Sequence, residues 1–352
     1  MRQNHFFRAF EGLRGVAVLS VVIFHCTYGW PGYLAVECFM LLSGFVLAHT
    51  CLDRSDRPDG KEFVLRRLAR LYPIHFLGIL AYALVYWLIH DGQWPSYPDG
   101  TLFTLLQHLT LLHNVGFNPH GLTWNFPDWC VSVELWVNVI VFFVLPLRMK
   151  TAHLLLISLA AYLLIFNNSH RLGVHHEVYW GWLASGLVRG FAGFMLGWFV
   201  YRIHVELKSG RLISQWSATF MELLILACLV PIFWLRLQDG ETDFIALGLM
   251  ALLLLVLSQE RGAVSQILST SVAVYLGRIS YPIYILHITV LDIFYQNQWH
   301  AGTLGLPLFL AEFIVTVVAV SSLAHHWIEE PCRRWYGRYR QNQQLTLAMA
   351  GP

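Results

Sequence analysis

An arginine and a histidine stand near opposite ends of the first apolar run of the sequence. Arg14 and His25 are separated by eleven positions, close to three helical turns, so both share one helix face about 16 Å apart along the axis. Ionisable side chains at membrane depth cost about 2.5–3.5 kcal/mol each. Each residue alone has a plain explanation: Arg14 could extend its side chain to lipid phosphates, and His25 could hydrogen-bond to a neighbouring helix. The shared face favours a functional pair.

Two carboxylates are candidates to assist this pair. Glu37 opens the second apolar run across a tight turn from His25, and we expect the two to meet, which would make His25 a better general base. Glu134 lies about one turn into a later run, "WCVSVELW", and needs a cation or a hydrogen-bond donor there. Arg189, deep in another run, is the expected counter-ion. A solvated Glu37 and an interhelical hydrogen bond at Glu134 are the plain alternatives.

A second arginine pair occurs in "RRLARLYP". Arg67 and Arg70 are three positions apart and share a helix face, where two guanidinium groups suit phosphate. The alternative is an anchor that touches anionic lipid. Ser43 belongs to the small-residue stretch "SGF", which helix packing explains as well as substrate binding does.

The remaining histidines and the cysteines predict neither a metal site nor a disulfide framework. The six cysteines are scattered, without C-x-x-C spacing, and the net charge of +2 gives no reason to expect nucleic acid as a partner. We expect no metal, and we expect interfacial positions for the other histidines: His108, His113, His120, His175, His176, His325 and His326.

Membrane helices must position these side chains. The 352 residues are 57% hydrophobic and 12% charged, with a mean hydropathy of +0.54, whereas soluble domains carry about 25% charged residues. Runs of apolar residues long enough to cross a bilayer predict an all-α polytopic membrane protein with about ten transmembrane helices. One membrane domain should cover residues 1–340, followed by a short cytoplasmic tail, 341–352. The spans are expected near 13–29, 33–51, 72–90, 131–147, 151–167, 180–201, 218–236, 243–258, 278–296 and 306–328.

Alternate connections are basic, which sets the orientation. Lys and Arg gather in the connection after the second span and in the tail, while none occurs from 71 to 147. Both termini should therefore be cytoplasmic, and the long connection before the fourth span should face outward. Its apolar stretch 101–113 is too short to cross, so an interfacial or re-entrant helix is expected.

The order of these motifs resembles the acyltransferase 3 family of integral-membrane acyltransferases. The matching pieces are "FEGLRGVAVLSVVIFH", "VECFMLLSGFVLA", "RRLARLYP", "WCVSVELW", "ISYPIYILH" and "WIEEPCRR". Three positions depart from the family pattern: Glu37 replaces an aspartate, Cys130 a serine and Leu135 a second glutamate.

The resemblance implies an O-acyltransferase of the inner membrane. It would move an acyl group, usually acetyl, from cytoplasmic acyl-CoA to a hydroxyl of a glycan, lipid-linked sugar or similar acceptor. Acetyl-CoA is then a substrate, and no permanently bound cofactor is expected. Arg14 and His25 match the essential pair, Glu134 a carboxylate in the core, and Arg67 and Arg70 the acyl-CoA entrance. Ser43 is assigned to the acyl-CoA site, and Glu37 to the catalytic group.

Several alternatives stay open. His25 could act as general base or carry the acyl group itself. The chain ends soon after the tenth predicted span, so an acyl relay should finish in the membrane domain or on a separate protein. A transporter or flippase could use buried Arg, His and Glu as a substrate or proton path, although the paired halves of such proteins are not visible. A lipid-linked scaffold explains neither the Arg14/His25 pair nor the Arg67/Arg70 pair. Membrane lipids are expected partners, and homo-oligomerisation is undecided.

Overall fold

Helices make up nearly all of the chain. The computed structural model describes residues 6–27, 29–52, 59–116, 123–145, 149–208, 213–235, 240–299 and 301–349. The α-helices are α1 Arg8–Thr27, α2 Ala35–Leu47, α3 Gly60–Ile89, α4 Thr101–Leu109, α5 Trp129–Val144, α6 Thr151–Ser169, α7 Ser185–Lys208, α8 Gln215–Trp234, α9 Gly240–Leu257, α10 Ala263–Leu268, α11 Ser271–Arg278, α12 Ser280–Gln296, α13 Ala301–Leu304, α14 Leu306–Ala324 and α15 Glu330–Met349. Short 3-10 helices η1 Gly32–Leu34 and η3 Phe126–Asp128, π-helical turns η2 Ala48–Leu52 and η4 His325–Glu329, and an antiparallel pair β1 Val178–Tyr179 and β2 Leu183–Ala184 complete the described elements.

Eight helical segments in the described part of the chain are long and apolar enough to cross a membrane. They are Arg8–Thr27, Gly32–Cys51, Gly60–Ile89, Phe126–Val144, Thr151–Ser169, Gln215–Trp234, Gly240–Leu257 and Leu306–Gln341. A ninth would be α11 with α12, which are bent by 64°. The all-α membrane class is therefore confirmed. The predicted span at 180–201 falls on α7, which is not among these segments, so the count of ten and the orientation stay predictions. His120 and parts of the basic connections (53–58, 146–148 and 209–212) lie outside the described residues.

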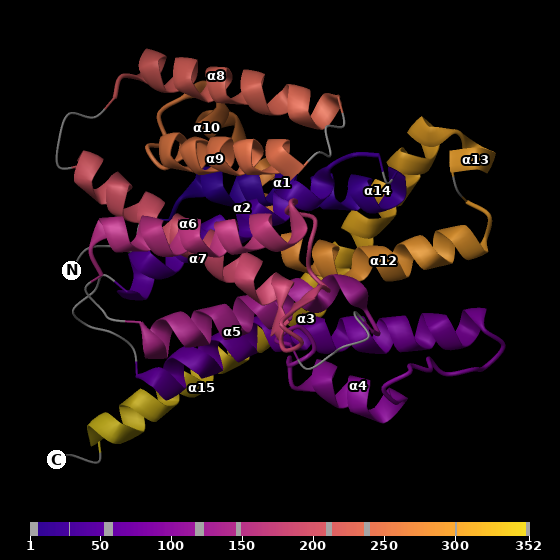
Figure 1. Cartoon of the computed structure of the whole chain (residues 1–352). Helices are drawn as coiled ribbons and strands as arrows, with labels where there is room; N and C mark the ends of the chain where they lie inside the picture. Colours follow the sequence, from indigo (N-terminus) through magenta and orange to yellow (C-terminus); the bar gives the residue numbers. More distant parts are fainter. Residues whose placement is uncertain are drawn as a thin grey trace.

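The helices form one bundle in which α1 and α2 lie at the centre. Figure 1 shows them between α8, α9 and α10 on one side and α3, α5 and α15 on the other. Helices α2 and α7 approach closely because both present glycine at their contact. A Cβ at Gly197 would lie 2.0 Å from the carbonyl oxygen of Leu41, and one at Gly44 would lie 2.0 Å from that of Phe194. Small residues at such contacts let membrane helices pack by van der Waals attraction.

The short helix α4 has its polar face inward and its apolar face outward. Thr104 and His108 are buried, whereas Leu102, Phe103 and Leu106 are exposed. This arrangement suits a helix that faces lipid on one side and a polar protein interior on the other. At nine residues it spans about half of a hydrocarbon core, in agreement with the short apolar helix expected within 101–113.

Candidate active site

Glu37 pairs with Arg189 rather than with His25. Its Oε1 lies 2.5 Å from Nε of Arg189, and its Oε2 accepts a hydrogen bond of 2.8 Å from the hydroxyl of Tyr162. Arg189 also donates to the carbonyl oxygen of Tyr33 at 2.8 Å. The predicted contact between His25 and Glu37 is therefore wrong. The guanidinium is always charged, so a buried carboxylate gains more from it than from a neutral imidazole.

The aromatic surroundings of Arg189 extend this network to the connection before α7. The guanidinium carbon lies 5.6 Å from the ring centroid of Trp129, within cation–π range. His175 stacks on the same indole with centroids 5.1 Å apart. Burial, followed by the charge of Arg189, lowers the pKa of His175 to about 3. The ring is therefore neutral at physiological pH.

His25 meets a second histidine, His287, on α12. Nε2 of His287 lies 2.9 Å from Nδ1 of His25, while Nδ1 of His287 lies 2.8 Å from the carbonyl oxygen of Tyr284. A carbonyl only accepts, so His287 carries its proton on Nδ1 and offers a lone pair on Nε2 to Nδ1–H of His25. His25 is left with an unprotonated Nε2, for which the described residues supply no hydrogen bond. That is the tautomer of a general base.

Three of the predicted site residues line one small cavity. Arg14, Ser43 and Glu134 border a space of about 50 Å³. Its wall is completed by Phe39, Met40, Cys130, Val131, Ser280, Tyr281 and Tyr284. Neither His25 nor His287 is among the residues that line this cavity; the ring of Tyr284, which does line it, has its centroid 6.0 Å from that of His287.

The counter-ion of Glu134 is Arg67, not Arg189. Nη1 of Arg67 lies 3.6 Å from Oε1 of Glu134. The expected Glu134–Arg189 pair is wrong, because Arg189 is already bound to Glu37. Arg67 thus turns toward the small cavity, whereas Arg70 lines a different one.

The second cavity is large and rich in charge. It measures about 510 Å³ and is lined by five arginines and three glutamates. These are Arg14, Arg70, Arg278, Arg333 and Arg334, with Glu11, Glu329 and Glu330; Phe6, Gly277, Tyr281 and His325 complete the wall. Arg14 and Tyr281 border both cavities, so these two residues separate the small space from the large one. Arginine clusters of this kind bind phosphate groups.

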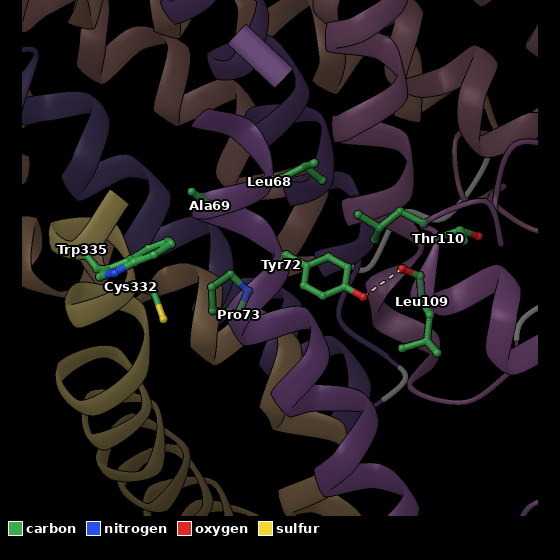
Figure 2. Close-up of a pocket in the computed structure, with 9 residues that line it drawn as sticks. Leu68, Ala69, Tyr72, Pro73, Leu109, Thr110, Cys332 and Trp335 are labelled. Atoms are coloured by element: carbon green, nitrogen blue, oxygen red, sulfur yellow. Dashed lines mark hydrogen bonds between the residues drawn. The ribbon is translucent and has the colours of Figure 1, made fainter. Parts of the chain in front are cut away.

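A third pocket is apolar and holds none of the predicted site residues. Figure 2 shows it between α3, the end of α4 and the start of α15, with a volume of about 620 Å³. Tyr72 donates a hydrogen bond of 3.1 Å to the carbonyl oxygen of Leu109 across it. This bond ties α4 to α3.

Comparison with known proteins shows the family to which the chain belongs. The family model of the acyltransferase domain, acyltransferase 3, matches residues 7–325, which contain Arg14, His25, Arg70, Glu134 and His287. The chain belongs to this family. The resemblance seen in the sequence motifs is thereby confirmed. No solved structure matches the chain.

Curated relatives are similar at low identity. The protein named "Putative peptidoglycan O-acetyltransferase YrhL" of Bacillus subtilis is 25% identical over 94% of this chain and 56% of its own length. "Putative O-acetyltransferase SACOL0978" of Staphylococcus aureus is 21% identical over 92% and 57%. "Putative acetyltransferase ORF330" of Acidianus two-tailed virus is 26% identical over 78% and 81%. The chain therefore spans little more than half the length of the first two relatives.

Proposed function

We propose that the chain is an O-acyltransferase that moves an acyl group, with acetyl as the first to be tested, from acyl-CoA to a hydroxyl of a glycan or lipid-linked sugar. The observation that carries the proposal is the position of Arg14, which borders both cavities. An arginine-rich space suits the phosphates of coenzyme A, and a small chamber with a histidine pair beyond it suits the reacting thioester. Membership of the acyltransferase 3 family supports the same activity.

The donor would bind with its phosphates among Arg70, Arg278 and Arg333. Its pantetheine arm would pass Arg14 and Tyr281 into the small cavity. If the orientation predicted from the basic connections holds, this entrance faces the cytoplasm and the acceptor lies on the outer side. A reporter fused at Gly60 is then cytoplasmic and one fused at Pro98 extracytoplasmic. The reverse result would contradict this sidedness and leave the chemistry of the site untouched.

His25 would act as the general base. Its Nε2 takes the proton of the acceptor hydroxyl while the oxygen bonds to the thioester carbonyl carbon. The carbon–sulfur bond then breaks, and the thiolate of coenzyme A recovers the proton from His25. In the alternative, Nε2 attacks the thioester carbonyl carbon, the carbon–sulfur bond breaks and the thiolate of coenzyme A leaves; the acceptor hydroxyl then takes the acyl group from Nε2 and gives its proton to the thiolate. His287 orients the ring in both routes.

Labelled acetyl-CoA supplied to membranes that contain the protein tests the proposal. We expect label on glycan or lipid-linked sugar with the wild type and with His153→Ala, an exposed control histidine. His25→Ala should abolish transfer. A cell-wall glycan is the first acceptor to try, because one relative carries peptidoglycan in its name. Undiminished transfer by His25→Ala would refute the assigned base, and CoA-independent substrate movement would favour a transporter.

Acid quenching without acceptor separates the two routes. Label trapped on the protein in the wild type and absent from His25→Ala would identify an acyl-histidine. No trapped label, together with normal transfer when acceptor is added, would leave His25 as the base.

A further inference from the structure

The apolar pocket between α3, α4 and α15 (Figure 2) opens onto the surface that the bundle presents to lipid. Its α3 wall includes Ala69 and Pro73, which stand on one helical stripe with exposed apolar side chains. These side chains are Leu65, Phe76 and Leu80. The α4 wall, Leu109 and Thr110, continues the exposed apolar face of that helix in the same way. A hydrocarbon chain can therefore enter the pocket sideways from the bilayer.

The hydroxyl groups in the wall of this pocket are already bonded to the protein. Tyr72 donates to the carbonyl oxygen of Leu109 at 3.1 Å, and Thr110 donates to that of Leu106 at 2.7 Å. The other lining residues are Leu, Ala, Pro, Cys and Trp. The volume of about 620 Å³ lies within the range of ligand pockets, about 300–1,000 Å³. The lining therefore suits a hydrocarbon chain rather than a sugar or a nucleotide.

The wall that α4 contributes is held in place by a buried cluster of three histidines around Asp128. Nδ1 of His108 lies 3.1 Å from Oδ2 of Asp128, and Nε2 of His113 lies 3.1 Å from Oδ1. On α3, His75 contacts the same carboxylate at 3.2 Å through Nδ1 and the carbonyl oxygen of His108 at 2.8 Å through Nε2. The sequence predicted interfacial positions for His108 and His113; that prediction is wrong, because the inward polar face of α4 and the turn after it bury both rings. These contacts fix the spacing of α3 and α4, so the pocket between them is preformed.

One end of the pocket carries the aromatic side chains typical of a membrane interface. Trp335 forms part of the wall and stacks on Tyr339 with centroids 5.8 Å apart. The two side chains are 67% and 47% exposed, and Trp and Tyr gather at the level of the lipid head groups. Helix α15 runs antiparallel to α3 here, because Glu62 pairs with Arg340 while Ala69 shares the pocket with Trp335. The head-group level therefore lies toward the beginning of α3, and the pocket extends from it into the hydrocarbon layer.

Arginines gather at the same end of the pocket. Arg66 lies one turn before Ala69 on α3, and Arg338 lies one turn beyond Trp335 on α15. Together with two further exposed or half-exposed arginines they form the arginine rim: Arg66, Arg334, Arg338 and Arg340. Glu62 and Glu330 pair with members of this rim, so four positive charges face two negative ones. Guanidinium groups that outnumber their carboxylates attract phosphate.

The combination of an apolar pocket and a positive rim selects a lipid by its charge. A chain that leaves the bilayer for the pocket exchanges one apolar environment for another, so preference among lipids comes from the head group. A zwitterionic head group brings its own cation to the rim, whereas an anionic one does not. We propose that this pocket binds one anionic glycerophospholipid, with an acyl chain between α3, α4 and α15 and its phosphate at the arginine rim. The site does not depend on the proposed reaction.

Photocrosslinking of the full chain in detergent tests the proposal. The probe is phosphatidylglycerol with a diazirine in one acyl chain, and the cross-links are mapped by peptide mass spectrometry. We expect them to concentrate on 68–73, 109–111 and 332–335, and unlabelled phosphatidylglycerol to compete far better than phosphatidylcholine. Cross-links spread evenly over lipid-facing helices such as α8, or equal competition by both lipids, would overturn the proposal. Stronger competition by a polyprenyl phosphate would overturn the choice of a glycerophospholipid.

Matched variants separate the rim from the pocket. Each arginine near an anionic lipid contributes a factor of about five in affinity, so Arg66→Gln/Arg338→Gln should weaken competition by phosphatidylglycerol roughly 25-fold. Arg261→Gln, at an exposed arginine away from the pocket, should not. Ala69→Phe fills the pocket and should remove the cross-links at 332–335, whereas Ala227→Phe on exposed α8 should keep them. An unchanged lipid preference in the double variant, or unchanged cross-links in Ala69→Phe, would contradict the site.

Thiol labelling of the wild type covers the case in which Ala69→Phe does not fold. Cys332 lies in the wall of the pocket, while Cys228 is exposed on α8. Phosphatidylglycerol should slow the alkylation of Cys332 by a membrane-permeant maleimide relative to phosphatidylcholine, and Cys228 should react at the same rate in both lipids. Equal rates at Cys332 in the two lipids would overturn the proposal.

Discussion

Removing both partners of the Glu37–Arg189 pair should destabilise the protein less than the two single removals added together. Arg189 and Glu37 are 1% and 0% exposed, so either single substitution leaves a charge buried without its counter-ion. Breaking a buried pair in this way costs about 3–5 kcal/mol. We therefore expect Glu37→Gln and Arg189→Met each to lower the free energy of unfolding by that amount.

The double variant Glu37→Leu/Arg189→Met should recover much of this loss. An apolar pair of similar volume is often as stable as the ion pair it replaces. Two hydrogen-bonding groups still lose their partners, the hydroxyl of Tyr162 and the carbonyl oxygen of Tyr33, at about 1–3 kcal/mol each. The double variant should therefore cost less than the sum of the single variants, with a coupling energy of about 2–3 kcal/mol.

Denaturant unfolding of the detergent-solubilised variants, followed by far-UV circular dichroism, measures these differences. Arg66→Met is the matched control, because Arg66 forms an i,i+4 ion pair with Glu62 and its side chain is 43% exposed. Such a pair contributes about 0.3–0.5 kcal/mol. Unchanged unfolding of Glu37→Gln, combined with lost acetyl transfer and a shifted pH–rate profile, would refute this reasoning and return Glu37 to the catalytic group.

Three further substitutions test the helix contacts, the acid response and the small cavity. Gly197→Ala drives its Cβ into the carbonyl oxygen of Leu41 and should lower the Tm by at least several degrees. The control is Gly248→Ala, where a Cβ meets nothing within 4 Å; this variant should be neutral or stabilising by up to about 1 kcal/mol. The pKa of His175 is lowered to about 3 in the folded protein from about 6.5 in the unfolded chain. Below pH 6.5 the unfolded chain therefore binds a proton at His175 that the folded protein does not bind, and the free energy of unfolding falls by about 1.4 kcal/mol per pH unit. Unfolding measured at pH 7, 6 and 5 should therefore show a smaller acid loss in His175→Gln, and an identical slope would contradict this prediction. Ser43→Leu overfills a cavity of about 50 Å³, and crowding worth about 1–3 kcal/mol should slow acetyl transfer by about 5- to 150-fold, while Ser43→Ala should retain it.

The helices could be predicted from the sequence because each depends on local composition. Apolar runs bounded by polar residues locate α1, α2 and the later spans, and the short run at 101–113 is too brief to cross. The positions of Arg14 and Glu134 follow from helical spacing within a single run. Motif order then identifies the family. These features require no knowledge of which helix lies beside which.

The partners of the buried charges depend on which helices are neighbours and on how each helix is rotated about its own axis. Local sequence patterns contain neither kind of information. The sequence predicted Glu134 as the partner of Arg189, and only the packing of α7 against α2 brings Arg189 to Glu37 instead. His287 was visible as a histidine within a span, but its contact with His25 joins positions 262 residues apart. The cluster at 75, 108, 113 and 128 comes from two helices, a turn and η3, so it has no periodic spacing to reveal it.

The position of Arg14 between the two cavities has a kinetic consequence. In the proposed reaction, Arg14 borders both the cavity assigned to the donor and the cavity assigned to the thioester, so it would contribute to ground-state binding and to the transition state together. Substituting it should raise KM and lower kcat at once, so neither constant alone reports its role. Arg70 borders only the larger cavity and Ser43 only the smaller one. The two constants should separate at these positions, with Arg70 governing KM and Ser43 governing kcat.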